Sequence, residues 1–202
     1  LGIATMEQWM SAKVPIKFGA IAPGDGTYDV PKVIEATLGV PIQIVTGYKG
    51  TAPIRLAFNS NEVAGLSNSW QSLKSTWTKE LENNEVVLLA QMATKAHADL
   101  PKVPLAVSFA KSDEARKLIV AVAQRHGAAV RPYLLPPGTP KHLVEILRKG
   151  FMAAIRDPEL LAEAGRARLE INAASGEDLE RNVKELLLLD KPLVTRLKDI
   201  LK

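Results

Sequence analysis

The segment 45–53 (Val-Thr-Gly-Tyr-Lys-Gly-Thr-Ala-Pro) has the residue types of an anion-binding turn. The β-branched run 42–46 precedes a glycine-containing turn at 47–50, and Thr51 can cap a helix that has Pro53 in its first turn. Free backbone N–H groups at a helix start, together with the helix dipole, favour a bound anion such as a carboxylate. An ordinary turn between a strand and a helix has the same features, so both interpretations stay open.

Two further polar turns, at 22–27 and 67–70, also follow predicted strands. In open parallel sheets, ligands bind beyond the carboxyl ends of the strands. All three turns are expected on that edge, and together they predict a binding site without catalytic chemistry.

Several charged and aromatic side chains near these turns allow two interpretations. Lys49 either pairs with a ligand carboxylate or points to water, and Tyr48 and Trp70 either form the wall of a pocket or pack in the core. In the second half of the chain, Arg131 before Pro132 is the best charged candidate for a ligand contact.

Residue sets for catalysis or metal binding are missing from the sequence. Cysteine is absent, and the three histidines are far apart without a second ligand at metal-binding spacing. There is no nucleophile elbow, phosphate-binding loop or zinc-protease motif. Gly24-Asp-Gly26 lacks the third glycine of a dinucleotide fingerprint. We therefore expect no cofactor, no metal and no enzymatic activity.

The elements that position the turns alternate between strand and helix in the first ninety residues. Hydrophobic spacing predicts helices over about 30–38, 51–60 and 70–81. The predicted strands are 16–21, 42–46, 62–67 and 86–90, the last buried on both faces. This βαβαβαβ order predicts an α/β fold with a mostly parallel sheet.

The second half of the chain is expected to be mostly helical. A helix at 113–126 and a short strand at 130–135 precede four helices, and Thr139 with Pro140 is predicted to cap the first of them. Asp157-Pro158 and Ser175 with Asp178 are further cap signals. These amphipathic helices must cover a sheet, either that of residues 16–90 or one whose strands are not in this chain.

The composition is that of a globular protein. The chain has 202 residues, 47% hydrophobic and 24% charged, with a net charge of +4. Basic residues do not gather into a stripe interleaved with aromatics, so a nucleic-acid partner is not expected. No stretch has the roughly 20 apolar residues of a membrane span. Because the chain begins at Leu1 rather than Met, we expect a processed or truncated piece.

Five motifs occur in an order and spacing typical of one family: 47–53, 62–65, 99–104, 136–140 and 175–177. On these motifs the chain resembles the extracytoplasmic substrate-binding receptors of tripartite tricarboxylate transporters, the Bug-type periplasmic binding proteins. The resemblance extends from about Ile16 to the end of the chain.

The resemblance implies a type II periplasmic-binding-protein-like fold of two α/β lobes around a cleft. One lobe would span residues 1–127, and residues 128–202 would be the mostly helical C-terminal part of the other, incomplete, lobe. Members capture small organic acids, often carboxylates, in the periplasm for membrane transporter subunits. The family's signal peptide and the first half of its first lobe have no counterpart here. Apolar helix faces left without their sheet would make self-association of the truncated chain expected.

The resemblance also assigns ligand contacts to the turns. The residues are Gly24, Asp25, Gly26, Thr27, Tyr48, Lys49, Gly50, Thr51, Ser67, Asn68 and Ser69. Asp25 would place a negative charge at the position expected for a carboxylate ligand. The alternative is an effector-binding domain of a LysR-type transcriptional regulator, which would require an adjoining helix-turn-helix, and none is found. An enzyme would require a paired nucleophile and base, for which the sequence offers no candidate.

Overall fold

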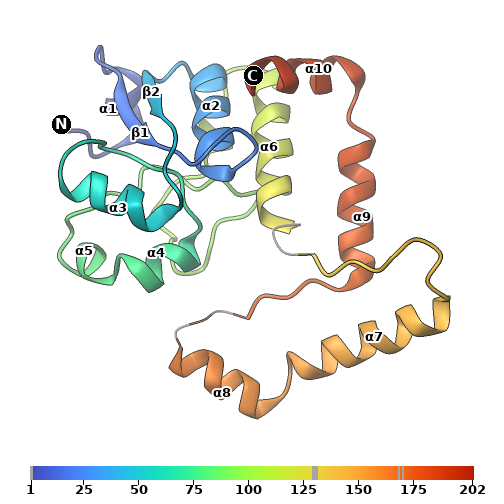
Figure 1. The fold of residues 1–202 in the computed structure, drawn as a ribbon. Helices are drawn as coiled ribbons and strands as arrows, with labels where there is room; N and C mark the ends of the chain where they lie inside the picture. The colour runs from blue at the N-terminus through green and yellow to red at the C-terminus, as the bar shows by residue number, and fades with distance from the viewer. Residues whose placement is uncertain (1, 129–131, 168, 170) are drawn as a thin grey trace.

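The computed structural model describes residues 2–128, 132–167, 169 and 171–202. An α/β body is followed by two helices that lie away from it and two that return to it (Figure 1). The elements are α1 (Met6–Met10), β1 (Ile16–Gly19), α2 (Gly26–Leu38), β2 (Ile42–Val45), α3 (Thr51–Asn59), α4 (Trp70–Thr76), α5 (Thr78–Glu82), the 3-10 turn Ala106–Phe109, α6 (Asp113–Ala128), α7 (Lys141–Ala154), α8 (Pro158–Arg166), α9 (Gly176–Leu187) and α10 (Lys191–Ile200).

The sheet is a parallel pair, with α2 as the crossover between its strands. The register pairs Ile16 with Ile42 at one end and Gly19 with Val45 at the other. A third segment lies along the other side of β1, where the Gly19 N–H donates to the Gly65 carbonyl at 3.0 Å. The predicted α/β fold class is therefore confirmed, with a smaller sheet than expected.

Three predicted strands are wrong or incomplete. Segment 62–67 contributes only a single parallel bridge, between Phe18 and Gly65. The run 86–90 forms no strand, since backbone pairing begins only at Gln91, which bridges Leu105. The run is not buried on both faces either, because Val87 is 53% exposed. An apolar run becomes a strand only where a neighbouring backbone completes its hydrogen-bond ladder. In the predicted strand 130–135, residues 130 and 131 lie outside the described residues, and 132–135 are not a strand.

The main core lies between the sheet, α1, α2 and α6. Trp9 stacks on Phe18 with ring centroids 5.3 Å apart, and Val33 and Ile119 are buried beside them. Leu193 of α10 is buried in the same cluster, so the last helix packs on the α/β body, against α2 and α6. The expected lobe boundary at residue 127 stays a prediction.

Several helix ends follow the predicted cap residues. Asp157 accepts hydrogen bonds from the amides that open α8, and the Ser175 hydroxyl accepts one from the Asp178 amide. Thr139 does not cap α7, because its hydroxyl donates instead to the Pro136 carbonyl. The helix predicted over 70–81 is split into α4 and α5 at Trp77, whose side chain is almost fully buried.

The helices α7, α8 and α9 leave much apolar surface uncovered. α7 and α8 lie well apart from the α/β body (Figure 1). Within the described part of 132–202 there is no strand for them to cover. The large exposed side chains include Leu143, Ile146, Leu147, Phe151, Leu160, Leu161, Val183 and Leu187. The predicted exposure of one face of these helices is thus confirmed.

None of the helices in the described ranges is both long and apolar enough to cross a lipid bilayer.

Candidate ligand-binding edge

The turns after β1 and β2 lie side by side at the carboxyl edge of the sheet. The Ala20 N–H donates to the Val45 carbonyl at 2.8 Å, and the Gly47 N–H donates to the Ile21 carbonyl at 3.1 Å. The Ile21 N–H in turn donates to the Thr27 hydroxyl oxygen at 2.9 Å. The first two predicted contact segments, 24–27 and 48–51, are therefore joined through a short chain of hydrogen bonds.

A glycine in β1 lets α3 approach this edge closely. A Cβ atom at Gly19 would lie 2.6 Å from Cγ2 of Ile54, the buried side chain in the first turn of α3. Val63 and Ala57 complete a small core beneath the helix, and Tyr48 packs against it from the turn. The start of α3 is thereby held next to the end of β1.

The start of α2 is closed by the chain's own carboxylate. Asp25 is the N-cap residue, and its Oδ1 accepts from the Thr27 amide at 2.8 Å and from the Thr27 hydroxyl at 2.5 Å. Thr27 is buried, so its polar side chain serves the turn itself. The Gly24 amide donates to Oδ1 of the fully buried Asp29. The negative charge expected at Asp25 is therefore directed at the helix start.

The start of α3 is open by comparison. The cap position falls on Gly50, which has no side chain, and the first turn contains no acidic residue. Thr51 is the first helical residue, so its predicted role as N-cap is wrong. The first amides of a helix have no partner inside the helix, and without a capping side chain they can donate to an external group. Thr51 is half-buried and Ala52 is exposed.

Two side chains next to this helix start have different surroundings. The Tyr48 hydroxyl donates to Oε1 of Glu62 at 2.6 Å. This hydrogen bond, with partial burial and the negative charge of Glu62, raises the pKa of Tyr48 to about 12. Tyr48 thus remains a neutral hydrogen-bond donor over the physiological pH range. Lys49 is exposed at the same turn.

The third predicted segment, 67–69, starts another helix. The Ser69 hydroxyl oxygen accepts from the Ser72 amide at 3.2 Å, and the Asn68 side-chain amide donates to the Ser72 hydroxyl. Ser69 therefore closes the start of α4 as Asp25 closes that of α2. Arg131 lies outside the described residues. The assignment of all these positions as ligand contacts stays a prediction.

Sequence reasoning missed three residues that shape this edge. Glu62 holds Tyr48, and Asp29 and Arg125 hold Gly24. No local sequence signal marks Arg125, 96 residues after Asp29, as the partner of this carboxylate. Helical spacing places it on α2 but does not indicate that it is buried.

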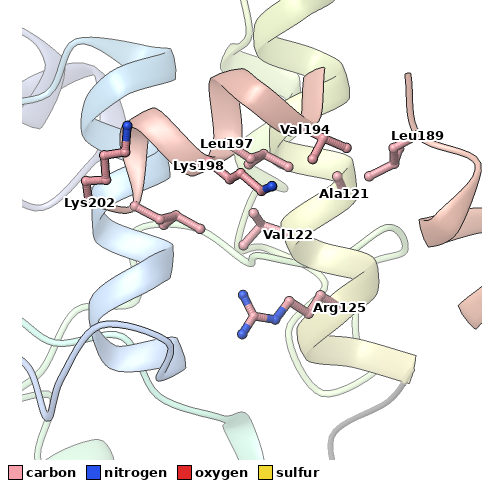
Figure 2. Close-up of a pocket in the computed structure, with 9 residues that line it drawn as sticks. Ala121, Val122, Arg125, Leu189, Val194, Leu197, Lys198 and Lys202 are labelled. Carbon is pink, nitrogen blue, oxygen red and sulfur yellow. The ribbon is translucent and has the colours of Figure 1, made fainter. Parts of the chain in front are cut away.

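A groove of about 450 Å³ lies elsewhere, between α6 and α10. Figure 2 shows its apolar floor with the basic side chains of Arg125, Lys198 and Lys202 around it. It contains none of the predicted contact residues, and we do not identify it with the ligand site. Across the described part of the chain, no group of three acidic or histidine side chains could hold a metal ion.

Comparisons with known proteins find the same fold in two solved structures. No family model matches the sequence, and no curated protein matches it. Among solved structures, a TctC solute binding protein from Polaromonas without ligand matches 97% of this chain with a TM-score of 0.63 and 16% identity. Rpa4515 of R. palustris, solved with adipate, matches 100% of this chain with a TM-score of 0.61 and 19% identity.

The likeness establishes the fold and its extent. The chain spans 62% of the R. palustris protein and 63% of the Polaromonas protein. The predicted resemblance to tricarboxylate-type binding receptors is thus confirmed at the level of fold.

Proposed function

We propose that the chain is part of a receptor that binds a small organic acid through a carboxylate held at the start of α3. The observation that carries this proposal is the contrast among the three helix starts that follow β1, β2 and the bridge at Gly65. Asp25 caps α2 and Ser69 caps α4, whereas α3 has no side-chain cap. An anion can therefore complete the hydrogen bonding of α3 without displacing a side chain.

The surroundings of α3 also favour a carboxylate. Lys49 adds positive charge at the same turn, whereas the Tyr48 hydroxyl gives its one proton to Glu62 and is therefore not a ligand donor. Hydrogen bonds from amides to an ionised acceptor are shorter and stronger than those to a neutral one. The adipate in the R. palustris neighbour is a dicarboxylate, which makes that ligand class the first to test.

The fold shared with solute-binding proteins supports a binding function over an enzymatic one. We further propose that the protein acts in the periplasm and delivers its ligand to membrane subunits of a tripartite tricarboxylate-type transporter. Neither solved neighbour favours the alternative of an effector-binding domain of a transcriptional regulator.

Calorimetric titration of the full gene product with adipate tests the ligand class. Adipamide is the matched control, because it has the same carbon chain and carries no charge. The proposal predicts saturable binding of adipate and none of adipamide. Equal binding of the two, or no binding of any mono-, di- or tricarboxylate in a panel, would refute it.

The uncovered faces of α7, α8 and α9 support a second proposal about partners. Contiguous apolar patches larger than a few hundred Å² are rare on monomers. We propose that the 202-residue chain alone self-associates through these faces, which sedimentation velocity tests directly.

A further inference from the structure

We propose that Asp29 and Arg125 are positioning residues that fix the 22–27 turn against α6 and thereby set the affinity for the ligand at the neighbouring α3 start. The effect on ligand affinity rests on the proposed function. The claim that the two residues fix the position of the 22–27 turn does not depend on a ligand.

The pair holds both backbone groups of Gly24. Oδ1 of Asp29 accepts from the Gly24 N–H at 2.9 Å, and Nη2 of Arg125 donates to the Gly24 carbonyl at 3.2 Å. The two side chains are joined by a 2.9 Å ion pair between Nη1 of Arg125 and Oδ2 of Asp29. Figure 2 shows Arg125 reaching from α6 toward α2.

The burial of this carboxylate makes the arrangement specific. The Asp29 side chain is 0% exposed, whereas the Arg125 side chain is 47% exposed. A buried carboxylate without its partner charge is strongly unfavourable, so Asp29 keeps Arg125 in this one place. The planar guanidinium donates to Asp29 and to Gly24 at the same time through two fixed N–H groups. A lysine ammonium on its flexible stem does not fix the two acceptors in one geometry.

A continuous set of hydrogen bonds leads from Gly24 toward the ligand edge. Asp25, next to Gly24, accepts from Thr27, whose hydroxyl oxygen accepts from Ile21. The Ile21 carbonyl accepts from the Gly47 amide at the start of the second turn. A displacement of Gly24 would therefore reach the turn that leads into α3.

The pair also connects this edge to the end of the α/β body. Arg125 lies in the last turn of α6, the last helix before the chain continues toward α7 (Figure 1). The two residues lie 96 positions apart and belong to different elements of the main core. They are thus placed to transmit the position of α6 to the first binding turn.

The test uses Arg125→Lys, which keeps the positive charge beside Asp29 and removes the fork that also reaches Gly24. Arg116→Lys is the matched control, because Arg116 is an exposed arginine on the same helix. Adipate affinity is measured by calorimetry, the unfolding temperature by circular dichroism, and the amide signals of Gly24 and Gly47 by NMR.

The proposal predicts that R125K remains folded, binds adipate more weakly and shifts both amide signals, whereas R116K changes none of them. The loss of affinity is up to about tenfold, the limit reached when the energy of the lost hydrogen bond of about 1.5 kcal/mol is fully coupled to the ligand. Wild-type affinity in R125K, or a fall in unfolding temperature with unchanged affinity and unchanged Gly47 signal, would overturn it. If the unmodified protein binds no carboxylate, the proposed function fails and with it the affinity effect. The positioning of the turn is then decided by the Gly47 signal, whose movement in R125K supports it and whose constancy refutes it.

Discussion

The Thr51 amide provides the sharpest perturbation of the proposed binding mode. Thr51 is the first residue of α3, a position where proline is well tolerated because its missing N–H has no partner inside the helix. The residue before a proline is excluded from the α region, and Gly50 already lies outside that region, with φ of 158° and ψ of 179°. The substitution Thr51→Pro therefore deletes one ligand donor and leaves the helix intact.

The expected size of the effect follows from the kind of bond that is lost. A hydrogen bond to a charged group is worth about 1.5–3 kcal/mol, which corresponds to roughly a 10- to 150-fold loss of adipate affinity at 1.4 kcal/mol per tenfold. Thr51→Ala is the matched control, because it removes the hydroxyl and keeps the amide. Calorimetry should show near-normal binding for T51A and much weaker binding for T51P.

Two outcomes would contradict this reasoning. If T51P binds adipate as tightly as the unmodified protein, the α3 amides do not hold the carboxylate. If T51A loses as much affinity as T51P, the Thr51 hydroxyl and not the helix start is the donor. Thermal unfolding of both variants shows whether the fold is intact, and equal unfolding temperatures are expected.

Three further predictions follow from the packing and the charges. Gly19→Ala forces a methyl group against α3 and is expected to lower the free energy of unfolding in urea by about 1–3 kcal/mol; a change below about 0.5 kcal/mol, the usual limit for uncritical surface sites, would contradict the close approach. Because folding raises the pKa of Tyr48 to about 12, its contribution to stability is present below pH 10 and is lost toward pH 12. Ultraviolet titration should show this late-ionising phase, absent from Tyr48→Phe and at lower pH in Glu62→Gln; identical curves for all three would refute it. Leu147→Lys on the uncovered face of α7 should reduce self-association in sedimentation velocity, whereas Leu56→Lys, an equally apolar exposed site on α3, should not; equal effects would contradict the assignment of the interface.

The alternation of strands and helices along the first sixty residues could be predicted from the sequence. Hydrophobic spacing and turn residues located β1, α2, β2 and α3, and parallel pairing brought the turns of 22–27 and 47–50 to one edge. The same local signals failed at 86–90. An apolar run indicates burial, but a strand also needs a hydrogen-bonding neighbour, which no local pattern specifies.

The details of the candidate site depended on contacts that the sequence does not reveal. A threonine before a proline-containing first turn predicted a cap at Thr51, whereas Thr51 is the first helical residue and the cap position falls one residue earlier, on Gly50. Cap assignments shift by a residue or two because adjacent positions satisfy the same pattern. The link between Asp29 and Arg125 depends on how α2 and α6 pack, so it became visible only in three dimensions.

Amide NMR during an adipate titration tests the central claim most directly. The account predicts saturable shifts of the Thr51 and Ala52 signals at the open start of α3, with a smaller response of the Thr27 amide, which Asp25 already occupies. Saturable binding that moves Thr27 while leaving Thr51 and Ala52 unchanged would contradict it.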